Sequence, residues 1–139
     1  MKQTTKIFAV MLIAFLLLVG NTFAQDNKQP LLVVSFQKVK MGEVQNATKT
    51  INEKFAPILN DLVDKGMLES WGLFNHTWGD EWNLNVWYVA KDMMAFEKFW
   101  DEYTKRISAD AWKELRGYML EHKDNIYTIM NQYPVPPER

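Results

Sequence analysis

The fold is decided by residues 67–90, which read MLESWGLFNHTWGDEWNLNVWYVA. This stretch holds two segments rich in aromatic and β-branched residues, a composition that favours β-strands. Gly79 and Asp80 lie between the segments, and such a pair is typical of the turn of a hairpin. The stretch therefore predicts two neighbouring antiparallel strands, Met67–Trp78 and Trp82–Ala90.

The register of this hairpin decides which side chains share a face of the sheet. A loop of two or four residues centred on the Gly-Asp pair places Gly72 opposite Trp87, whereas a three-residue loop would exchange the two faces. The more apolar face is expected to pack under helices; it consists of Trp71, Leu73, Asn75, Thr77, Trp82, Leu84, Val86, Tyr88 and Ala90. The other face mixes aromatic and hydrogen-bonding side chains; it consists of Ser70, Gly72, Phe74, His76, Trp78, Glu81, Asn83, Asn85, Trp87 and Val89.

The chain before the hairpin predicts one strand and one helical region. An apolar, β-branched segment indicates a strand at Leu31–Lys40. Apolar residues at intervals of three and four then predict a helix from Val44 to Val63. Pro57 should kink or divide this helix, and Gly66 should end it.

The chain after the hairpin predicts a second helical region and a last strand. Asp92 is a suitable N-cap for a helix whose aromatic stripe runs from Phe96 to Ile107. The segment 108–110 interrupts the pattern, and a further short helix carries Trp112, Leu115, Tyr118 and Met119. We expect a fourth strand at Ile126–Met130 and a proline-rich tail at 133–137 that does not pair in a sheet.

The predicted order is β-α-β-β-α-β, which is the order of a ferredoxin-like fold of the α+β class. Its four antiparallel strands form one sheet, and both helical regions cover the same face. The other face is left open, and an apolar open face must be covered by something.

The first 24 residues resemble a secretory signal peptide. Lys2 and Lys6 give a basic start, residues 7–19 form an unbroken run of 13 apolar residues, and Thr22-Phe23-Ala24 is a small-residue cleavage pattern. The alternative is a transmembrane anchor, but the run is shorter than the roughly 20 residues that a bilayer needs. We expect cleavage after Ala24 and an exported, periplasmic or secreted, single domain of residues 25–139 without a membrane anchor.

The composition excludes several classes of protein. The chain has 139 residues and no cysteine, which excludes disulfides, thiolate metal sites and cysteine nucleophiles. Its two histidines, His76 and His122, and the absence of a ligand spacing motif lead us to expect no metal site. The formal net charge of −1 argues against a nucleic-acid binder.

A cavity on the open face is the first candidate site. Six side chains of the mixed face are expected to line it: Phe74, His76, Trp78, Asn83, Asn85 and Trp87. Ser35 and Gln37, which share one face of the first strand, could join this polar set. His76 is the candidate proton shuttle, since histidine is the side chain most often used for acid–base catalysis near neutral pH. The alternative is that the aromatic side chains only fill a core and a dimer interface.

The element order, together with the segment WYVAKDMMAF at residues 87–96, resembles the dimeric α/β-barrel superfamily. The resemblance implies that two sheets meet face to face in a homodimer and close a shared barrel. It also implies a choice among cofactor-free monooxygenases, haem-degrading enzymes, lactone isomerases and members without known activity.

The haem-degrading branch is a poor match. Its first strand carries an Asn, where this chain offers Ser35 and Gln37. Its Trp-to-His spacing of ten residues is met by Trp112 and His122, but His122 lies beyond the interruption of the helix. We therefore expect no cofactor.

Two functions remain open at the level of sequence. One is an exported protein that binds a small apolar or aromatic molecule. The other is a small cofactor-independent enzyme, of monooxygenase, isomerase or lyase type, that uses His76. A purely structural dimer is a third possibility.

Overall fold

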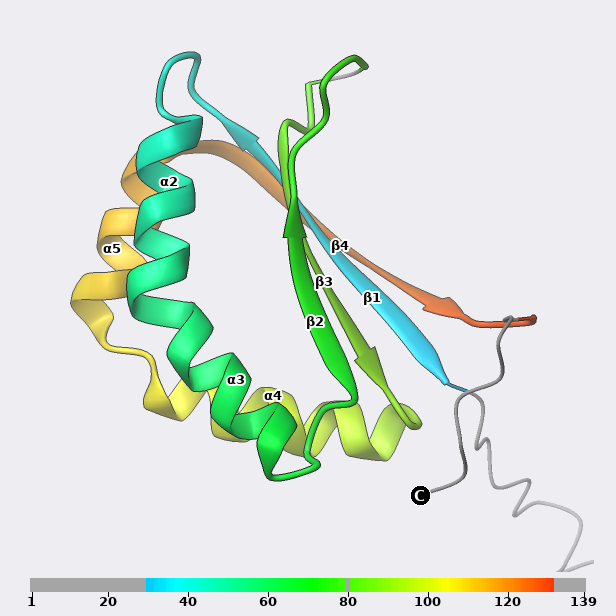
Figure 1. The fold of residues 1–139 in the computed structure, drawn as a ribbon. Coiled ribbons are helices and arrows are strands. Elements are labelled where there is room, and N and C mark those ends of the chain that lie inside the picture. Colours follow the sequence, from blue (N-terminus) through cyan, green and yellow to red (C-terminus); the bar gives the residue numbers. More distant parts are fainter. Residues whose placement is uncertain (1–29, 80, 132–139) are drawn as a thin grey trace, which may run out of the picture.

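The computed structural model describes residues 30–79 and 81–131 (Figure 1). The expected leader and the expected tail therefore lie outside the described residues. The elements are β1 (Leu31–Val39), α2 (Val44–Thr50), the π-helical turn η1 (Ile51–Phe55), α3 (Ala56–Asp64), β2 (Ser70–Phe74), β3 (Leu84–Ala90), α4 (Met93–Arg106), α5 (Ala109–Tyr118) and β4 (Met119–Thr128). Within the described residues, no helix has the length and apolar character needed to cross a membrane.

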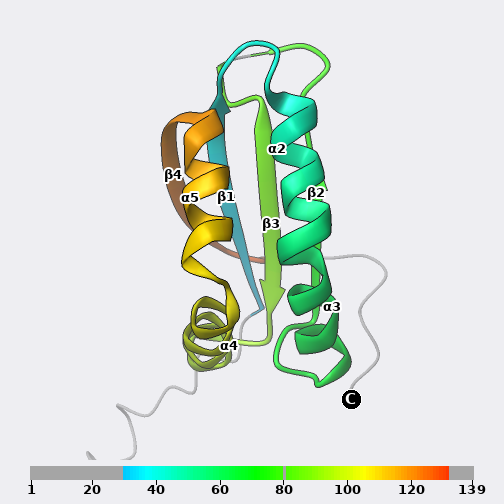
Figure 2. The same ribbon diagram turned by 90° about the vertical axis from the view of Figure 1, so that its left-hand side faces the viewer.

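The four strands form one antiparallel sheet in the order β2-β3-β1-β4. Among the described residues, the helices α2 to α5 lie on the same side of this sheet, as Figures 1 and 2 show. The predicted β-α-β-β-α-β fold with helices on one face is thus confirmed. No helix within residues 30–79 and 81–131 lies on the opposite side, which we call the open face.

The predicted register of the hairpin is confirmed. Gly72 pairs with Trp87, and Trp71 pairs with Tyr88 on the helix side of the sheet. The strands are shorter than predicted, however, because the ladder ends where Phe74 meets Asn85. Residues 75–79 and 81–83 lie outside both strands, so a long connection, 75–83, takes the place of the expected tight turn. The residue pattern continues past the last pair, but only pairing and packing define where a strand stops.

Pro57 divides the first helical region, as predicted. It stands in the first turn of α3, directly after the π-helical turn η1. There the missing N–H of proline removes no hydrogen bond that the new helix needs. At the other end of α3, Gly66 adopts φ +69°. Its N–H donates to the Val63 carbonyl at 2.9 Å, and the Met67 N–H donates to the Leu62 carbonyl at 3.0 Å, which closes the helix with a Schellman motif.

The second helical region is capped twice. The Asp92 carboxylate accepts a hydrogen bond from the Ala95 N–H at 2.8 Å and begins α4. Ser108 accepts from the Ala111 N–H at 3.1 Å and begins α5. Each cap satisfies an N–H group that the first helical turn leaves unpaired. The interruption predicted at 108–110 is therefore a corner between two helices.

The last strand differs from the prediction. β4 begins at Met119, directly after α5, and Asp124 and Asn125 lie in its middle, paired with Ser35 and Val34. The sequence pattern misses this start because β4 is an edge strand whose residues 120–128 are all exposed. Charged side chains are common on edge strands, where they oppose aggregation.

The core lies between the sheet and the helices. Its largest fully buried side chains are Phe55, Phe99, Ile51, Leu59, Leu62, Leu68 and Leu84. Aromatic rings of α4 extend the core over β3: the rings of Phe99 and Tyr103 stack with centroids 5.4 Å apart, and Phe99 lies 5.6 Å from Tyr88.

Candidate functional site

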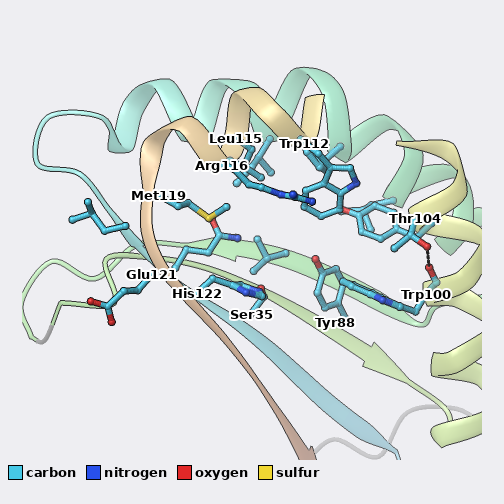
Figure 3. A pocket seen from close by; sticks show the side chains of 17 residues that line it. Ser35, Tyr88, Trp100, Thr104, Trp112, Leu115, Arg116, Met119, Glu121 and His122 are labelled. Carbon is cyan, nitrogen blue, oxygen red and sulfur yellow. Dashed lines mark hydrogen bonds between the residues drawn. The ribbon is translucent and has the colours of Figure 1, made fainter. Parts of the chain in front are cut away.

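A cavity of about 650 Å³ lies between the helix side of the sheet and the helices (Figure 3). Most of its wall is apolar or aromatic. The lining residues are Ser35, Gln37, Ile51, Phe55, Leu59, Val86, Tyr88, Trp100, Tyr103, Thr104, Trp112, Leu115, Arg116, Met119, Leu120, Glu121 and His122. The exposed ones come from the end of α5 and the start of β4, so the cavity opens at this edge of the sheet.

The floor of the cavity is formed by the central strands and carries two polar side chains. Ser35 and Gln37 of β1 are only 6% and 5% exposed. The Gln37 Oε1 atom has no hydrogen-bond partner among the described residues. A buried acceptor without a partner costs free energy, so a native structure that keeps one calls for an explanation.

Two tyrosines form the deep wall. Tyr88 of β3 and Tyr103 of α4 are almost fully buried and share a hydrogen bond between their hydroxyl groups. Loss of solvent raises the pKa of Tyr88 well above its ordinary value, and it raises the pKa of Tyr103 as well. Both hydroxyls therefore stay neutral at physiological pH and serve as hydrogen-bonding groups.

The roof of the cavity combines aromatic rings with a cation. The ring of Trp112 meets Phe55 edge-on with centroids 5.1 Å apart. The Arg116 guanidinium lies over the Trp112 ring, 5.6 Å from its centroid. Figure 3 shows both side chains reaching from α5 across the cavity from Ser35 and Tyr88.

Two pairs of polar side chains lie near the opening. Glu121 forms an ion pair with Lys38 at 3.1 Å. His122 Nε2 lies 3.1 Å from Asp124 Oδ1, and the His122 side chain is about half exposed. The sequence pattern did not associate His122 with a cavity.

The predicted site residues are not brought together. Three of them, Phe74, Asn85 and Trp87, lie on the open face. There Phe74 pairs with Asn85, and Trp87 pairs with Gly72. Ser35 and Gln37 pair with Val86 and Leu84, so they lie on the helix side of the sheet and not with Trp87 as expected. The reason is the β1–β3 pairing, which joins strands separated by a helical region and is not fixed by a turn.

The other three predicted residues belong to the 75–83 connection. Trp78 is 96% exposed. The Asn83 side chain is held by the Val39 backbone: its Oδ1 accepts from the N–H at 2.8 Å, and its Nδ2 donates to the carbonyl at 3.0 Å. His76 is half-buried in the connection, outside the lining of the cavity. A single pocket built from these residues is therefore not what the chain forms, and a catalytic role of His76 stays a prediction.

The open face is apolar with a few polar groups. Phe74 and Tyr127 are each 43% exposed there. Asn85 is buried: its Nδ2 donates to the Trp82 carbonyl at 3.0 Å, while its Oδ1 has no partner. Lys123 Nζ lies 4.2 Å from the centroid of the Trp82 ring.

The sequence predicted a cavity on the open face and did not indicate the one under the helices. The available signal was the pair Ser35 and Gln37, because polar residues on alternate positions of an otherwise apolar strand share one face. The depth of the cavity, by contrast, depends on how far α4 and α5 stand from the sheet. Among the described residues, no group of three or more His, Asp or Glu side chains could hold a metal ion.

No protein-family model matches the chain, and no curated protein matches its sequence. Solved structures do match its fold. A dimeric ferredoxin-like protein from an uncultured marine organism has a TM-score of 0.65 and 11% identity, over 80% of this chain and 96% of that one. A NIPSNAP family protein from Agrobacterium tumefaciens has a TM-score of 0.59 and 10% identity, over 76% and 90%. A putative antibiotic biosynthesis monooxygenase from Nitrosomonas europaea has a TM-score of 0.57 and 11% identity, over 78% and 96%.

At these identities the likeness concerns the fold. The three neighbours carry different names, and the first of them is described as dimeric. The chain thus has a ferredoxin-like fold, which agrees with the fold that the resemblance drawn from its sequence implies.

Proposed function

We propose that this protein binds a small, largely apolar molecule with an aromatic ring in the cavity between sheet and helices. The observation that carries the proposal is the cavity itself, about 650 Å³ walled by Tyr88, Trp100 and Trp112. Protein interiors are close-packed, and large voids cost stability. A small domain that keeps such a space lined with aromatic rings and a few polar groups matches the usual make-up of a ligand site.

The test is calorimetric titration with 2-naphthol as the probe. Trp112→Ala removes one aromatic wall and should weaken binding about tenfold, since loss of an aromatic contact is worth roughly 1 kcal/mol or more. Trp78→Ala is the matched control, because Trp78 is exposed and does not line the cavity. Equal binding by both variants, or no binding by the wild type, would reject the proposal.

A second candidate is a cofactor-independent enzyme that uses the same cavity. The observation in its favour is the pairing of His122 with Asp124 at the opening, since a carboxylate orients an imidazole for proton transfer. The wild type and His122→Gln would each be incubated with a small-molecule extract of the host. An enzyme predicts compounds whose amounts change only with the wild type, whereas a pure binder predicts no such difference by mass spectrometry.

The proposed assembly is a homodimer joined through the open face. Structural neighbours are described as dimeric, and this face exposes Phe74 and Tyr127 on the side of the sheet opposite the described helices. Sedimentation should give a dimer for the wild type and a monomer for Phe74→Glu. Met94→Glu, which adds the same charge at an exposed position of α4, should stay dimeric. A monomeric wild type at micromolar concentration would contradict the proposal.

We also propose that the protein is exported and that the leader is removed after Ala24. The support is the sequence pattern of residues 1–24, which lie outside the described residues. N-terminal sequencing of protein from the host should begin at Gln25. An intact Met1 would be inconsistent with cleavage.

A further inference from the structure

The acceptor of Gln37 is the first of two unmatched polar groups in the cavity. Its Oε1 atom is buried and has no partner, although the side chain lines a space large enough for another molecule. Folding removes this oxygen from water without supplying another hydrogen-bond donor, which costs free energy. A hydroxyl or N–H group of a ligand would supply the missing donor.

The second unmatched group is the guanidinium of Arg116. No carboxylate among the described residues pairs with it, and its contact there is the face of Trp112. Glu121, an acidic residue of the lining, is paired with Lys38, and Asp124 contacts His122. The opening therefore presents an unneutralised cation on the wall opposite the floor that holds Gln37.

We propose that the ligand is a hydroxylated aromatic acid, with its hydroxyl donating to Gln37 and its carboxylate held by Arg116. The aromatic ring then lies between Tyr88, Trp100 and Trp112, which fill the wall between the two polar ends. A carboxylate near the opening keeps part of its hydration, and an Arg fork matches its geometry. This assignment rests on the proposed binding function and adds the chemistry of the ligand to it.

The test compares four related probes by calorimetry: 6-hydroxy-2-naphthoic acid, 2-naphthoic acid, 2-naphthol and naphthalene. The wild type should bind the hydroxy acid about tenfold more tightly than either compound that lacks one group, because each removal leaves a polar partner unsatisfied. Gln37→Met, which keeps the length of the side chain, should abolish the preference for the hydroxyl. Arg116→Gln should abolish the preference for the carboxylate, and Lys113→Gln on the same helix should leave both preferences intact.

A thermal readout separates a binding role of Gln37 from a structural one. Gln37→Met removes an unpaired buried oxygen, so the melting temperature should rise by about 5 °C while the preference for the hydroxyl is lost. A fall in melting temperature would assign Gln37 to the core and overturn its role in binding. Equal affinity of the wild type for all four probes would overturn the ligand class but leave the binding function standing. Absence of binding to all four would overturn both.

Discussion

Gly72 is the residue on which the open face depends most directly. A Cβ atom at this position would lie 2.4 Å from Nε1 of Trp87, its partner across the strands. The indole ring of Trp87 therefore lies over the bare backbone of Gly72. An aromatic ring over a strand glycine replaces the packing that the glycine cannot provide.

Gly72→Ala should lower the free energy of unfolding by about 1–3 kcal/mol, because the rigid ring must leave its place. Gly117→Ala is the control with the opposite sign. Gly117 lies in α5 with nothing near its missing Cβ, so alanine should stabilise the helix by up to about 1 kcal/mol. Urea unfolding measures both changes, and an unchanged Gly72→Ala variant would contradict the packing argument.

At the scale of elements, the π-helical turn η1 keeps one stripe of buried side chains facing the core. The buried residues Ala47, Ile51, Phe55 and Leu59 recur every four positions, with 0–2% of each exposed. In a regular α-helix, each fourth residue is rotated by about 40° around the helix axis relative to the one before. Over three such intervals the rotation would carry this stripe of residues away from the core. The wide turn η1 takes up the excess and keeps Ile51 and Phe55 on the cavity.

Deleting Asn52 should convert η1 into a regular α-helical turn and place Pro57 in the interior of a helix. Since proline there costs about 3 kcal/mol, the deletion should destabilise the protein by about that amount. Pro57→Ala should restore most of the loss in the deletion variant and do little alone. Additive effects in urea unfolding would argue against this coupling.

The helices are tied together by ionic contacts that depend on pH. Thr50 donates to Glu114 at 2.7 Å and Lys54 donates to the same carboxylate, which joins α2 and η1 to α5. The hydrogen bond from Lys54, followed by that from Thr50, lowers the pKa of Glu114 below its ordinary value of 4.5. The contribution to stability is therefore present above about pH 4.5 and is lost as the pH falls through the lowered value.

Glu114→Gln should consequently reduce stability near neutral pH and flatten its decline in acid. Glu97→Gln, an exposed carboxylate on α4, serves as the reference. Thermal melts from pH 7 to pH 3 check the prediction. Parallel pH profiles for Glu114→Gln and the wild type would show that the contact has no net effect.

At the scale of the whole molecule, the sheet separates two surfaces. The cavity lies on its helix side, and the open face lies on the other. Phe74→Glu should therefore break the proposed dimer and leave the affinity for 2-naphthol within about threefold. Trp112→Ala should instead weaken the binding of 2-naphthol and leave the protein dimeric. Sedimentation measures the oligomeric state of both variants, and calorimetry measures their affinity. Loss of both properties in Phe74→Glu would show that the two sides are coupled.

The sequence by itself determined the element order, the hairpin register, the cap at Asp92 and the division at Pro57. Each depends on neighbours within a few residues, where periodicity, turn chemistry and backbone restriction act directly. The start of β4 could not be predicted, since an exposed edge strand shows no alternation of apolar residues. The place of Ser35 and Gln37 was decided only by tertiary structure. Alternation puts both on one face of β1, but pairing with β3 across an intervening helix decides that this face lies under the helices, where the cavity forms.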